Sequence, residues 1–374
     1  MARMDTPRTV VVTGASAGVG RAAAIEFARR GARVALIARG HEGLYGARRE
    51  IEALGAQALL LPLDVADADA VERAAERVER ELGPIEVWVN AAMATIFAPV
   101  HRIRADEYRR ATDVTYLGTV HGTQAALRRM RARNRGSIVQ VGSALAYRAI
   151  PLQSAYCAAK FAIRGFTDAL RVELQHERSA VQLTMVQLGA FNTPQFEWAR
   201  TRMPRRPKPV APIYQPEVAA RGIAFAADAG RREVWVGRSA VQAILGNKLA
   251  PWFADRVLRS QGYSGQLDEA PLPADRPDNL FEPVARDHGT HGRFDSRAKA
   301  RSPQLWLTEH RRAIGAGLLI GAALLIPGAA ARAYQRRKMR APRSATDDPA
   351  NAFAGDRKPA RRLRESSDGL GRYA

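Results

Sequence analysis

Short runs of apolar and β-branched residues alternate with amphipathic stretches from Thr9 to about Gly237. This alternation is typical of a parallel sheet whose strands are connected by helices on both faces. The runs lie at Thr9–Thr13, Arg33–Ala38, Gln57–Pro62, Val87–Asn90, Gly136–Gly142, Gln182–Gln187 and Glu233–Val236. Amphipathic stretches such as Arg21–Arg30 and Ala68–Glu81 lie between them and end at glycines. The pattern therefore predicts an α/β fold with a doubly wound, seven-stranded parallel sheet.

The pattern changes after Gly237. Ser239–Arg259 predicts one more amphipathic helix, whereas Ser264–Ala300 is rich in Pro, Asp, Gly and His without a sustained period, which is typical of a connecting segment. Ala313–Ala331 contains no charged residue, and the chain beyond it is polar and basic. We therefore expect a catalytic domain followed by a helical C-terminal extension. The predicted parts are the NADP(H)-binding catalytic domain at 1–238, a helical and loop-rich extension at 239–312, a transmembrane or membrane-inserted helix at 313–331 and a basic, disordered tail at 332–374.

Composition restricts the choice of partners. With 374 residues, of which 46% are hydrophobic and 25% charged, the chain is neither wholly disordered nor collagen-like. The net charge of +21 favours anionic partners, either nucleic acid or a membrane surface. Only six of the 58 basic residues are lysine, so scattered arginines indicate genome composition as much as phosphate binding. No nucleic-acid-binding module or set of interleaved aromatic residues is visible, and we expect no specific nucleic-acid partner.

The apolar segment Ala313–Ala331 suits a membrane. As a helix it would be about 28 Å long, against a hydrocarbon core of about 30 Å, and it has no polar stripe. A helix buried against the catalytic domain is the alternative. Residues 293–312 and 332–351 hold six Lys and Arg each, so charge does not orient the segment, and Pro327 leaves a re-entrant helix open. Cys157 is the single cysteine and Met1–Arg8 contains no signal-peptide-like stretch, so we expect a cytoplasmic catalytic domain attached to the inner face of a membrane.

A glycine-rich turn follows the first predicted strand directly and leads into a helix. Its sequence is Thr13-Gly14-Ala15-Ser16-Ala17-Gly18-Val19-Gly20. Glycines at these spacings let the backbone turn tightly and approach a pyrophosphate, whose charge is met by the free N–H groups at the helix N-terminus. A glycine-rich string alone is a weak signal, but its place between a strand and a helix predicts a dinucleotide site.

The end of the second strand predicts which dinucleotide binds. That strand ends in Ala38-Arg39, where no carboxylate repels a 2′-phosphate and the guanidinium can pair with one. We therefore expect NADP(H) and regard NAD(H) as less suitable, although Arg39 is also one arginine among many. Asp64, before Val65, is placed to accept a hydrogen bond from the adenine amino group or to cap the following helix.

Three further residues predict proton-transfer chemistry. Ser143 ends a predicted strand, Tyr156 follows thirteen residues later, and Lys160 lies four beyond Tyr156. A spacing of four places the phenol and the ammonium on one helical face, where the positive charge favours the tyrosinate. Lys160 is the only lysine among the first 207 residues, and its compact ammonium suits two ribose hydroxyls better than a guanidinium does. The alternative is that Tyr156 and Lys160 have no role in chemistry and lie on an ordinary solvated helix.

In these motifs the chain resembles the short-chain dehydrogenase/reductase superfamily, in the form that uses a tyrosine and a lysine. The resemblance covers about Thr9 to Gly237 and implies a Rossmann fold and an NAD(P)(H)-dependent interconversion of an alcohol and a ketone or aldehyde. It implies that Tyr156 is the general acid/base, that Ser143 binds the substrate oxygen, and that Lys160 tunes Tyr156 and holds the nicotinamide ribose. With the residues above, it predicts a cofactor site formed by Gly14, Ser16, Gly18, Val19, Gly20, Arg39, Asp64, Val65, Asn90, Tyr156, Lys160 and Thr193. No metal site is expected.

Three positions depart from the family pattern. Asn90-Ala91-Ala92-Met93 stands where the family has Asn-Asn-Ala-Gly, and Leu188-Gly189 replaces Pro-Gly. Thr115 replaces the asparagine that supports a proton-relay water. Because that asparagine is thought to act largely through its backbone carbonyl, Thr115 stays in the predicted catalytic set. These departures motivate an alternative, a catalytically weak cofactor-binding scaffold or regulator of the same fold.

The stretch between Pro194 and Pro216 lies where the superfamily has its variable substrate-covering loop. Gln195–Trp198 contributes aromatic groups, which suit a lid over a hydrophobic alcohol or carbonyl substrate. The basic residues that follow either attract an acidic carrier or lipid headgroup or form a solvated loop face; they are Arg200, Arg202, Arg205, Arg206 and Lys208. The resemblance also suggests a homodimer or homotetramer through the helices that carry Tyr116–Met130 and Tyr156–Arg171.

Overall fold

A seven-stranded parallel sheet forms the centre of the protein. The computed structural model describes residues 7–311 and 313–317. The strands are β1 (Thr9–Thr13), β2 (Arg33–Ala38), β3 (Ala58–Pro62), β4 (Ile85–Asn90), β6 (Ser137–Ser143), β7 (Gln182–Leu188) and β12 (Glu233–Val236), in the order β3-β2-β1-β4-β6-β7-β12. Every neighbouring pair is parallel. The predicted α/β fold is confirmed, and all seven strands lie where the apolar runs placed them.

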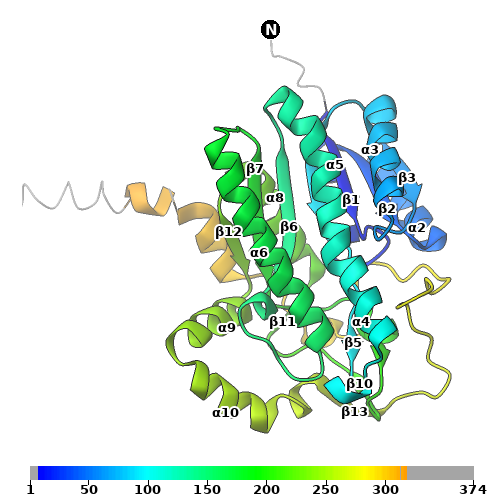
Figure 1. Ribbon diagram of the computed structural model, residues 1–374, viewed down its shortest axis with the longest axis vertical. Helices are drawn as coiled ribbons and strands as arrows, with labels where there is room; N and C mark the ends of the chain where they lie inside the picture. The colour runs from blue at the N-terminus through cyan, green and yellow to red at the C-terminus, as the bar shows by residue number, and fades with distance from the viewer. Residues whose placement is uncertain (1–6, 312, 318–374) are drawn as a thin grey trace, which may run out of the picture. The chain divides into compact units, whose positions relative to one another are not determined.

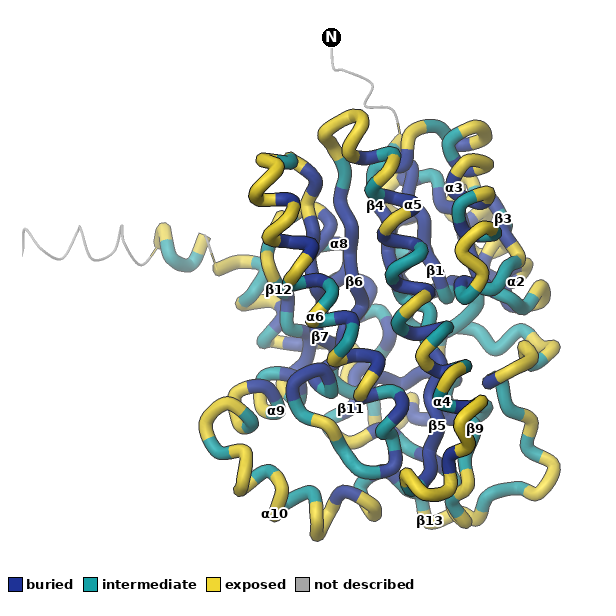
Figure 2. The backbone as a smooth tube through the Cα atoms, viewed as in Figure 1, coloured by how far each residue is buried: buried dark blue, intermediate teal, exposed yellow. Residues whose placement is uncertain are grey.

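Helices cover both faces of this sheet (Figure 1). On one face lie α1 (Gly18–Arg29), α2 (His41–Glu52) and α8 (Pro216–Ala229). On the other lie α3 (Ala68–Leu82), α5 (Gly118–Arg133) and α6 (Ser154–His176). Each face encloses its own apolar cluster, and the five inner strands between them are almost entirely buried, as the dark tube of Figure 2 shows. Burial on both faces explains why the strands read as continuous apolar runs.

The strand order fixes where a ligand can bind. The chain builds the sheet outward from β1 to β3 and then returns to β4 on the other side of β1. In doubly wound sheets, the loops after the two strands at this reversal diverge and leave a crevice at the carboxyl edge. The loop after β1 is the glycine-rich turn, and the loop after β4 begins at Ala91. The crevice therefore opens beside the residues predicted to bind a dinucleotide.

Short elements lie beyond the carboxyl edge of the sheet. They are α4 (Ala105–Thr112), the π-helical turn η2 (Asp113–Leu117), α7 (Gln195–Trp198) and the two-stranded pairs β5 (Ile96–Phe97) with β9 (Arg200–Thr201), β8 (Ala190–Phe191) with β11 (Ile213–Tyr214), and β10 (Arg205–Pro207) with β13 (Leu267–Pro271). Short 3-10 turns lie at Val100–Arg102, Ala144–Ala146, Ser264–Gln266 and Asp295–Arg297.

The single helix predicted over Ser239–Arg259 is wrong, because two helices occupy this stretch. They are α9 (Arg238–Leu249) and α10 (Pro251–Gln261), which meet at Ala250. Ala250 has φ −146° and ψ 69°, outside the helical region, and ends one helix while it precedes the next. Proline has no N–H to continue the first helix, but it is well placed in the first turn of a new one. The break turns α10 away from α9 (Figure 1).

Residues 276–292, which we call the C-terminal strap, contain no helix or strand. They lie within the segment predicted to be a connection, yet they pack along the catalytic domain. Leu280 is fully buried in the cluster that also contains Val65 and Val114. A further helical stretch follows at 303–311.

The chain divides into two units, 1–311 and 312–374. Among the described residues, no helix has both the length and the apolar character needed to cross a bilayer. The predicted membrane-inserted helix at 313–331 falls outside the described residues from 318 on, as does the predicted tail at 332–374. Both stay predictions.

Candidate active site

The glycine-rich turn has the backbone that its sequence predicts. Gly14 has φ +70° and Gly18 has φ +54°, conformations that side chains disfavour. A Cβ atom on Gly20 would lie 2.2 Å from the carbonyl oxygen of Gly14, so the helix can pass this close only without a side chain. Gly18 begins α1, and its position directs the first N–H groups of the helix toward the crevice. Thr193 packs directly against Gly18.

A first cavity of about 130 Å³ follows this turn along the carboxyl edge. Its lining includes most of the predicted adenosine-side residues: Gly14, Ser16, Arg39, Asp64 and Val65. Ala92 and Met93, from the loop after β4, also line it. The fold therefore brings the ends of β1, β2, β3 and β4 together around one space. Val19 is partly buried against the apolar core instead, and neither Thr193 nor Asn90 lines this cavity.

Arg39 and Asp64 lie at this cavity but already have partners. The guanidinium of Arg39 donates hydrogen bonds to the carbonyl oxygens of Asn279 and Phe281, at 2.5 Å each. Burial lowers the pKa of Arg39, and the neighbouring Arg110 lowers it further. Asp64 accepts a hydrogen bond from the backbone N–H of Ala66 and forms an ion pair with Arg110. The capping role considered for Asp64 is wrong, because Asp67 is the N-cap of α3 and its side chain accepts from the backbone N–H of Ala70. Arg39 is held by the C-terminal strap.

Ser143, Tyr156 and Lys160 come together at the ends of β6 and α6. Ser143 ends β6, and its hydroxyl forms a hydrogen bond with the phenol of Tyr156. Lys160 lies one helical turn beyond Tyr156, with Nζ 5.5 Å from the centre of the phenol ring. The Lys160 ammonium donates a 2.6 Å hydrogen bond to the carbonyl oxygen of Val141. The spacing read from the sequence therefore places all three groups in one cluster.

Burial controls the ionisation of this cluster in the cofactor-free protein. Lys160 is 3% exposed, and loss of hydration lowers its pKa to about 7. Burial also raises the pKa of the Tyr156 phenol far above its usual value, although the hydrogen bond with Ser143 opposes this. Lys160 is not among the groups that shift the pKa of Tyr156 here, and its predicted tuning role stays a prediction. Tyr156 is protonated and able to donate its proton.

A second and larger cavity, of about 750 Å³, opens at Ser143 and Tyr156. Met93 lines both cavities and so marks where they approach one another. The walls far from the tyrosine come from α9 and α10, with Ala243, Phe253, Val257 and Leu258 among the lining side chains. Gln153 and Gln266 add polar groups and bond to each other at 2.7 Å. The cavity is thus long, largely apolar and polar at a few defined points, as small-molecule sites usually are.

The side chains of Asn90 and Thr115, both predicted site residues, form buried hydrogen bonds within the fold. Asn90 is buried and bonds to Trp88, Thr123 and Gln140 below the cavity floor. Thr115 is fully buried in the π-helical turn, where its hydroxyl bonds to the backbone N–H and carbonyl of Ala94. Asn90 therefore connects β4 to α5 and β6, Thr115 holds the loop after β4, and neither residue lines either cavity. π-Helical turns are frequent at functional sites, and this one fixes the loop that carries Met93.

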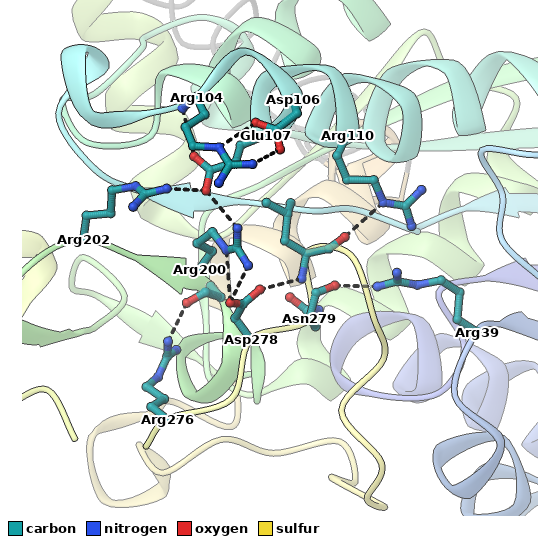
Figure 3. Close-up of polar contacts among 12 residues, drawn as sticks. Arg39, Arg104, Asp106, Glu107, Arg110, Arg200, Arg202, Arg276, Asp278 and Asn279 are labelled. Atoms are coloured by element: carbon teal, nitrogen blue, oxygen red, sulfur yellow. Dashed lines mark hydrogen bonds and ion pairs between the residues drawn. The ribbon is translucent and has the colours of Figure 1, made fainter. Parts of the chain in front are cut away.

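Two of the five basic residues of the substrate loop, Arg200 and Arg202, are held in ion pairs. Arg200 pairs with Glu107 at 2.8 Å and with Asp278 at 2.8 Å, and Arg202 also pairs with Glu107 (Figure 3). The Glu107 side chain is fully buried. These two guanidinium groups are therefore committed to a buried carboxylate that requires their charge, although Arg202 is also exposed to solvent.

Sequence reasoning missed the contribution of the C-terminal strap to this site. Asn279, Pro283, Val284, Arg286 and His288 line the first cavity together with the glycine-rich turn. Nothing in the strap's irregular pattern indicated a place in the fold, and only Leu280 among its apolar residues is fully buried. Among the described residues, no group of His, Cys, Asp or Glu side chains is arranged to hold a metal ion.

Comparison with known proteins gives a consistent result. A sequence profile described as short chain dehydrogenase matches residues 8–203. The chain is 31% identical over 323 residues to a Bacillus subtilis (strain 168) protein named uncharacterized oxidoreductase YxnA, a match that covers 84% of this chain and 90% of that protein. A match of that extent includes the C-terminal strap.

Two vertebrate reductases are similar over shorter stretches. The 3-dehydrosphinganine reductase of Danio rerio is 30% identical over 220 residues, 57% of this chain and 66% of that protein. The 3-ketodihydrosphingosine reductase of Bos taurus is 32% identical over 171 residues, 44% of this chain and 52% of that protein.

Proposed function

Because this chain belongs to the short-chain dehydrogenase family of oxidoreductases, we propose that it is an NADP(H)-dependent enzyme that interconverts a hydrophobic alcohol with its ketone or aldehyde, and that Tyr156 is its general acid/base. The observation that carries this proposal is that Ser143 and Tyr156 line a large, mostly apolar cavity, with Lys160 buried one helical turn beyond Tyr156. A phenol without an adjoining substrate cavity would not support it.

The residues present fit a dinucleotide of the family's kind. The turn at Gly14 and Gly18 provides backbone N–H groups at a helix N-terminus, which suit a diphosphate. Arg39, Asp64 and Val65 surround the space where the adenosine half would be held. The proposal assigns the nicotinamide ribose to Lys160, which lines neither cavity and bonds to the carbonyl oxygen of Val141. The family uses NAD(P)(H), which supplies or accepts the hydride. The protein supplies orientation and a proton path.

In the proposed mechanism Ser143 donates a hydrogen bond to the substrate oxygen and fixes it beside Tyr156. Tyr156 then donates its phenolic proton to that oxygen during reduction, and takes it back during oxidation. The phenol is protonated before the reaction, as reduction requires, and its raised pKa makes it a weak acid unless a positive charge stabilises the phenolate. Lys160 becomes more fully charged when ribose hydroxyls replace some of its lost hydration, and its ammonium then stabilises the phenolate left by proton transfer.

The second cavity supports a hydrophobic substrate of considerable length. Its walls at α9 and α10 are mostly apolar, and the neighbouring surface carries exposed apolar side chains: Leu245, Leu249, Trp252 and Phe253. Leu249 is 83% exposed and Trp252 is 67% exposed, which is rare for such residues on a soluble surface. The names of the two vertebrate relatives describe reductases of long-chain sphingoid ketones. We therefore place a lipid-like ketone first among candidate substrates.

The tyrosine mechanism is tested by Tyr156→Phe. The variant keeps the ring but cannot donate a proton, so turnover of lipophilic ketones should fall by about 10²-fold or more, while NADPH binding stays within a few fold. Turnover is followed as NADPH oxidation across a panel of ketones of increasing chain length. Tyr147→Phe is the matched control, because that phenol bonds to Glu233 and lines neither cavity. Equal activity of Tyr156→Phe and wild type would exclude the mechanism.

The rival function, a cofactor-binding scaffold with little turnover, rests on Met93 and Thr115. It predicts that NADPH binds with ordinary affinity while no ketone in the panel accelerates its oxidation. The two functions therefore separate in the same experiment, because the enzyme proposal requires both binding and turnover.

The preference for NADP(H) is tested by Arg39→Ala. Loss of the guanidinium should weaken NADPH binding by about tenfold or more, because the 2′-phosphate loses its counter-charge, and should change NADH binding much less. Dissociation constants from nucleotide fluorescence give both values. If NADPH and NADH binding weaken equally, Arg39 does not recognise the 2′-phosphate. Its role would then be to hold the strap, since it also bonds to the carbonyl oxygens of Asn279 and Phe281.

A further inference from the structure

The C-terminal strap passes over the cavity that would hold the adenosine half of the dinucleotide. Five strap residues share this cavity with the glycine-rich turn and with the ends of β2 and β3. The space left between them is about 130 Å³. Sites for ligands of this size usually measure about 300–1,000 Å³. With the strap in this position, the adenosine half has too little room.

The strap also engages the groups that a dinucleotide would use. The N–H of Gly18, at the N-terminus of α1, donates a 3.1 Å hydrogen bond to the carbonyl oxygen of Gly289. Arg39 donates to two strap carbonyl oxygens, and Arg110 donates to that of Leu280 at 3.0 Å. Figure 3 shows Arg39 and Arg110 both directed at this part of the strap. Strap carbonyls thus meet hydrogen-bond donors beside the predicted phosphate and ribose positions.

Side-chain contacts hold the strap along its whole length, including those of Arg276 with the carbonyl oxygens of Phe196 and Ala199 and of His291 with Glu217. Asp278 pairs with Arg200, and Leu280 is buried without exposed surface. Farther along, Asp287 pairs at 2.5 Å with Arg21, a residue of α1 that is only 2% exposed. The strap contains no helix or strand, so it can separate from the domain by breaking these local contacts while the sheet stays intact. Segments of this kind form the lids of many binding sites.

We propose that the C-terminal strap is the gate of the dinucleotide site, which has to open before the cofactor can bind or leave. This inference rests on the proposed function, because it assumes that the first cavity binds NADP(H). It assigns a role in cofactor exchange to residues 276–292, which lie beyond the 8–203 stretch matched by the family profile.

A reversible disulfide tests the gate directly. A Cβ atom on Gly46 would lie 2.6 Å from Cγ of Asp287, so the two positions face each other when the strap is closed. The double variant Gly46→Cys/Asp287→Cys can therefore form a disulfide that locks the strap onto α2. Cys157 is buried and does not compete. The full-length protein is used, oxidised or reduced, and NADPH binding is followed by the change in nucleotide fluorescence.

Oxidised protein should bind NADPH at least about tenfold more slowly than the same protein after reduction. The single variants Gly46→Cys and Asp287→Cys, tested in the same way, should show no dependence on reductant. Equal binding rates for the oxidised and reduced double variant, with the disulfide confirmed by mass, would overturn the gate. Failure of wild type and of every reduced variant to bind NADPH or NADH would instead overturn the proposed function.

Leu280→Ala tests the gate from the opposite direction. The smaller side chain loosens the strap, so bound NADPH, chased with excess unlabelled nucleotide, should dissociate about tenfold faster or more. Leu305→Ala is the matched control, because Leu305 is equally buried but packs in the other apolar cluster. A dissociation rate in Leu280→Ala within about twofold of wild type, in a folded protein, would contradict the proposal.

Discussion

At the scale of single residues, Lys160 combines a functional role with a cost in stability. Its side chain is 3% exposed, and Val141 supplies its hydrogen-bond acceptor. Burial lowers its pKa from 10.5 to about 7, so the folded protein binds a proton at this position less readily than the unfolded chain does. Between these two pH values the folded state therefore gains stability as the pH rises. Below about pH 7 the lysine is charged in both states, and the whole cost of burial remains.

Lys160→Met should therefore raise the stability of the cofactor-free protein while it removes activity. At pH 6 the free energy of unfolding should increase by on the order of 3 kcal/mol, because about 1.4 kcal/mol accompanies each unit of pKa shift and the bond to Val141 is lost. The gain should shrink as the pH rises toward 10. Urea unfolding at pH 6 and pH 9.5 measures both quantities. Lys248→Met, at an exposed lysine, should show no comparable gain, and a Lys160→Met protein less stable than wild type at pH 6 would refute the argument.

At the scale of elements, buried charge joins the substrate loop to α4. The Glu107 carboxylate accepts from Arg200 and Arg202 and from the backbone N–H of Arg104, which begins the helix. Burial alone would raise the pKa of Glu107, but the hydrogen bonds from Arg104 and Arg200 and the charge of Arg202 outweigh it and lower the pKa. Arg200 continues the connection to Asp278 of the strap. One carboxylate thus links α4, the substrate loop and the strap (Figure 3).

Glu107→Gln should therefore loosen three elements at once. The amide cannot balance two guanidinium groups, and we expect a loss of about 3 kcal/mol in unfolding free energy at pH 7. Chemical denaturation measures it. Glu81→Gln is the matched control, because Glu81 pairs with Arg77 on the exposed face of α3, where such pairs contribute about 1 kcal/mol at most. Equal effects of the two substitutions would show that the buried position of Glu107 is unimportant.

At the scale of the whole molecule, α6 presents an apolar stripe to solvent. Phe161, Gly165, Ala169 and Val172 are exposed and recur at helical spacing, so they lie on one side of the helix. Val172 is 63% exposed and Phe161 is 42% exposed. A helix that buries its other face against the sheet has no reason to be apolar here unless another surface covers it. This is the helix through which the resemblance suggested a dimer or tetramer.

We predict that this stripe is an interface between copies of the chain, so Phe161→Glu/Val172→Glu should lower the mass of the protein in solution. Two carboxylates on a stripe that pairs with its own copy are desolvated and repel each other, which should weaken association by about 10²-fold or more. Light scattering coupled to size exclusion gives the mass. Leu54→Glu/Val100→Glu changes two similarly exposed apolar residues elsewhere and should leave the mass unchanged. An unaltered mass for the α6 variant would remove this face from consideration.

The sequence by itself determined the sheet, the glycine-rich turn and the order of the catalytic groups. Burial on both faces makes each strand a continuous apolar run, and a strand end or a helical spacing of four places a side chain without reference to distant residues. This is why Thr9–Thr13, Arg33–Ala38 and Glu233–Val236 were predicted with their observed bounds. It is also why Ser143, Tyr156 and Lys160 lie together as their spacing indicated.

Only the tertiary structure decided which distant residues the predicted site residues contact. Arg39 bonds to carbonyl groups 240 and 242 residues away, and no local pattern encodes a contact of that separation. Three other features also depend on segments that are distant in the sequence and pack together on folding. They are the ion pairs of Glu107, the cavity wall at α9 and α10, and the burial that shifts the pKa of Lys160. Periodicity records which face of an element is buried. The identity of the partner is set by the packing of the whole chain, and here that packing lays the strap over the cofactor crevice.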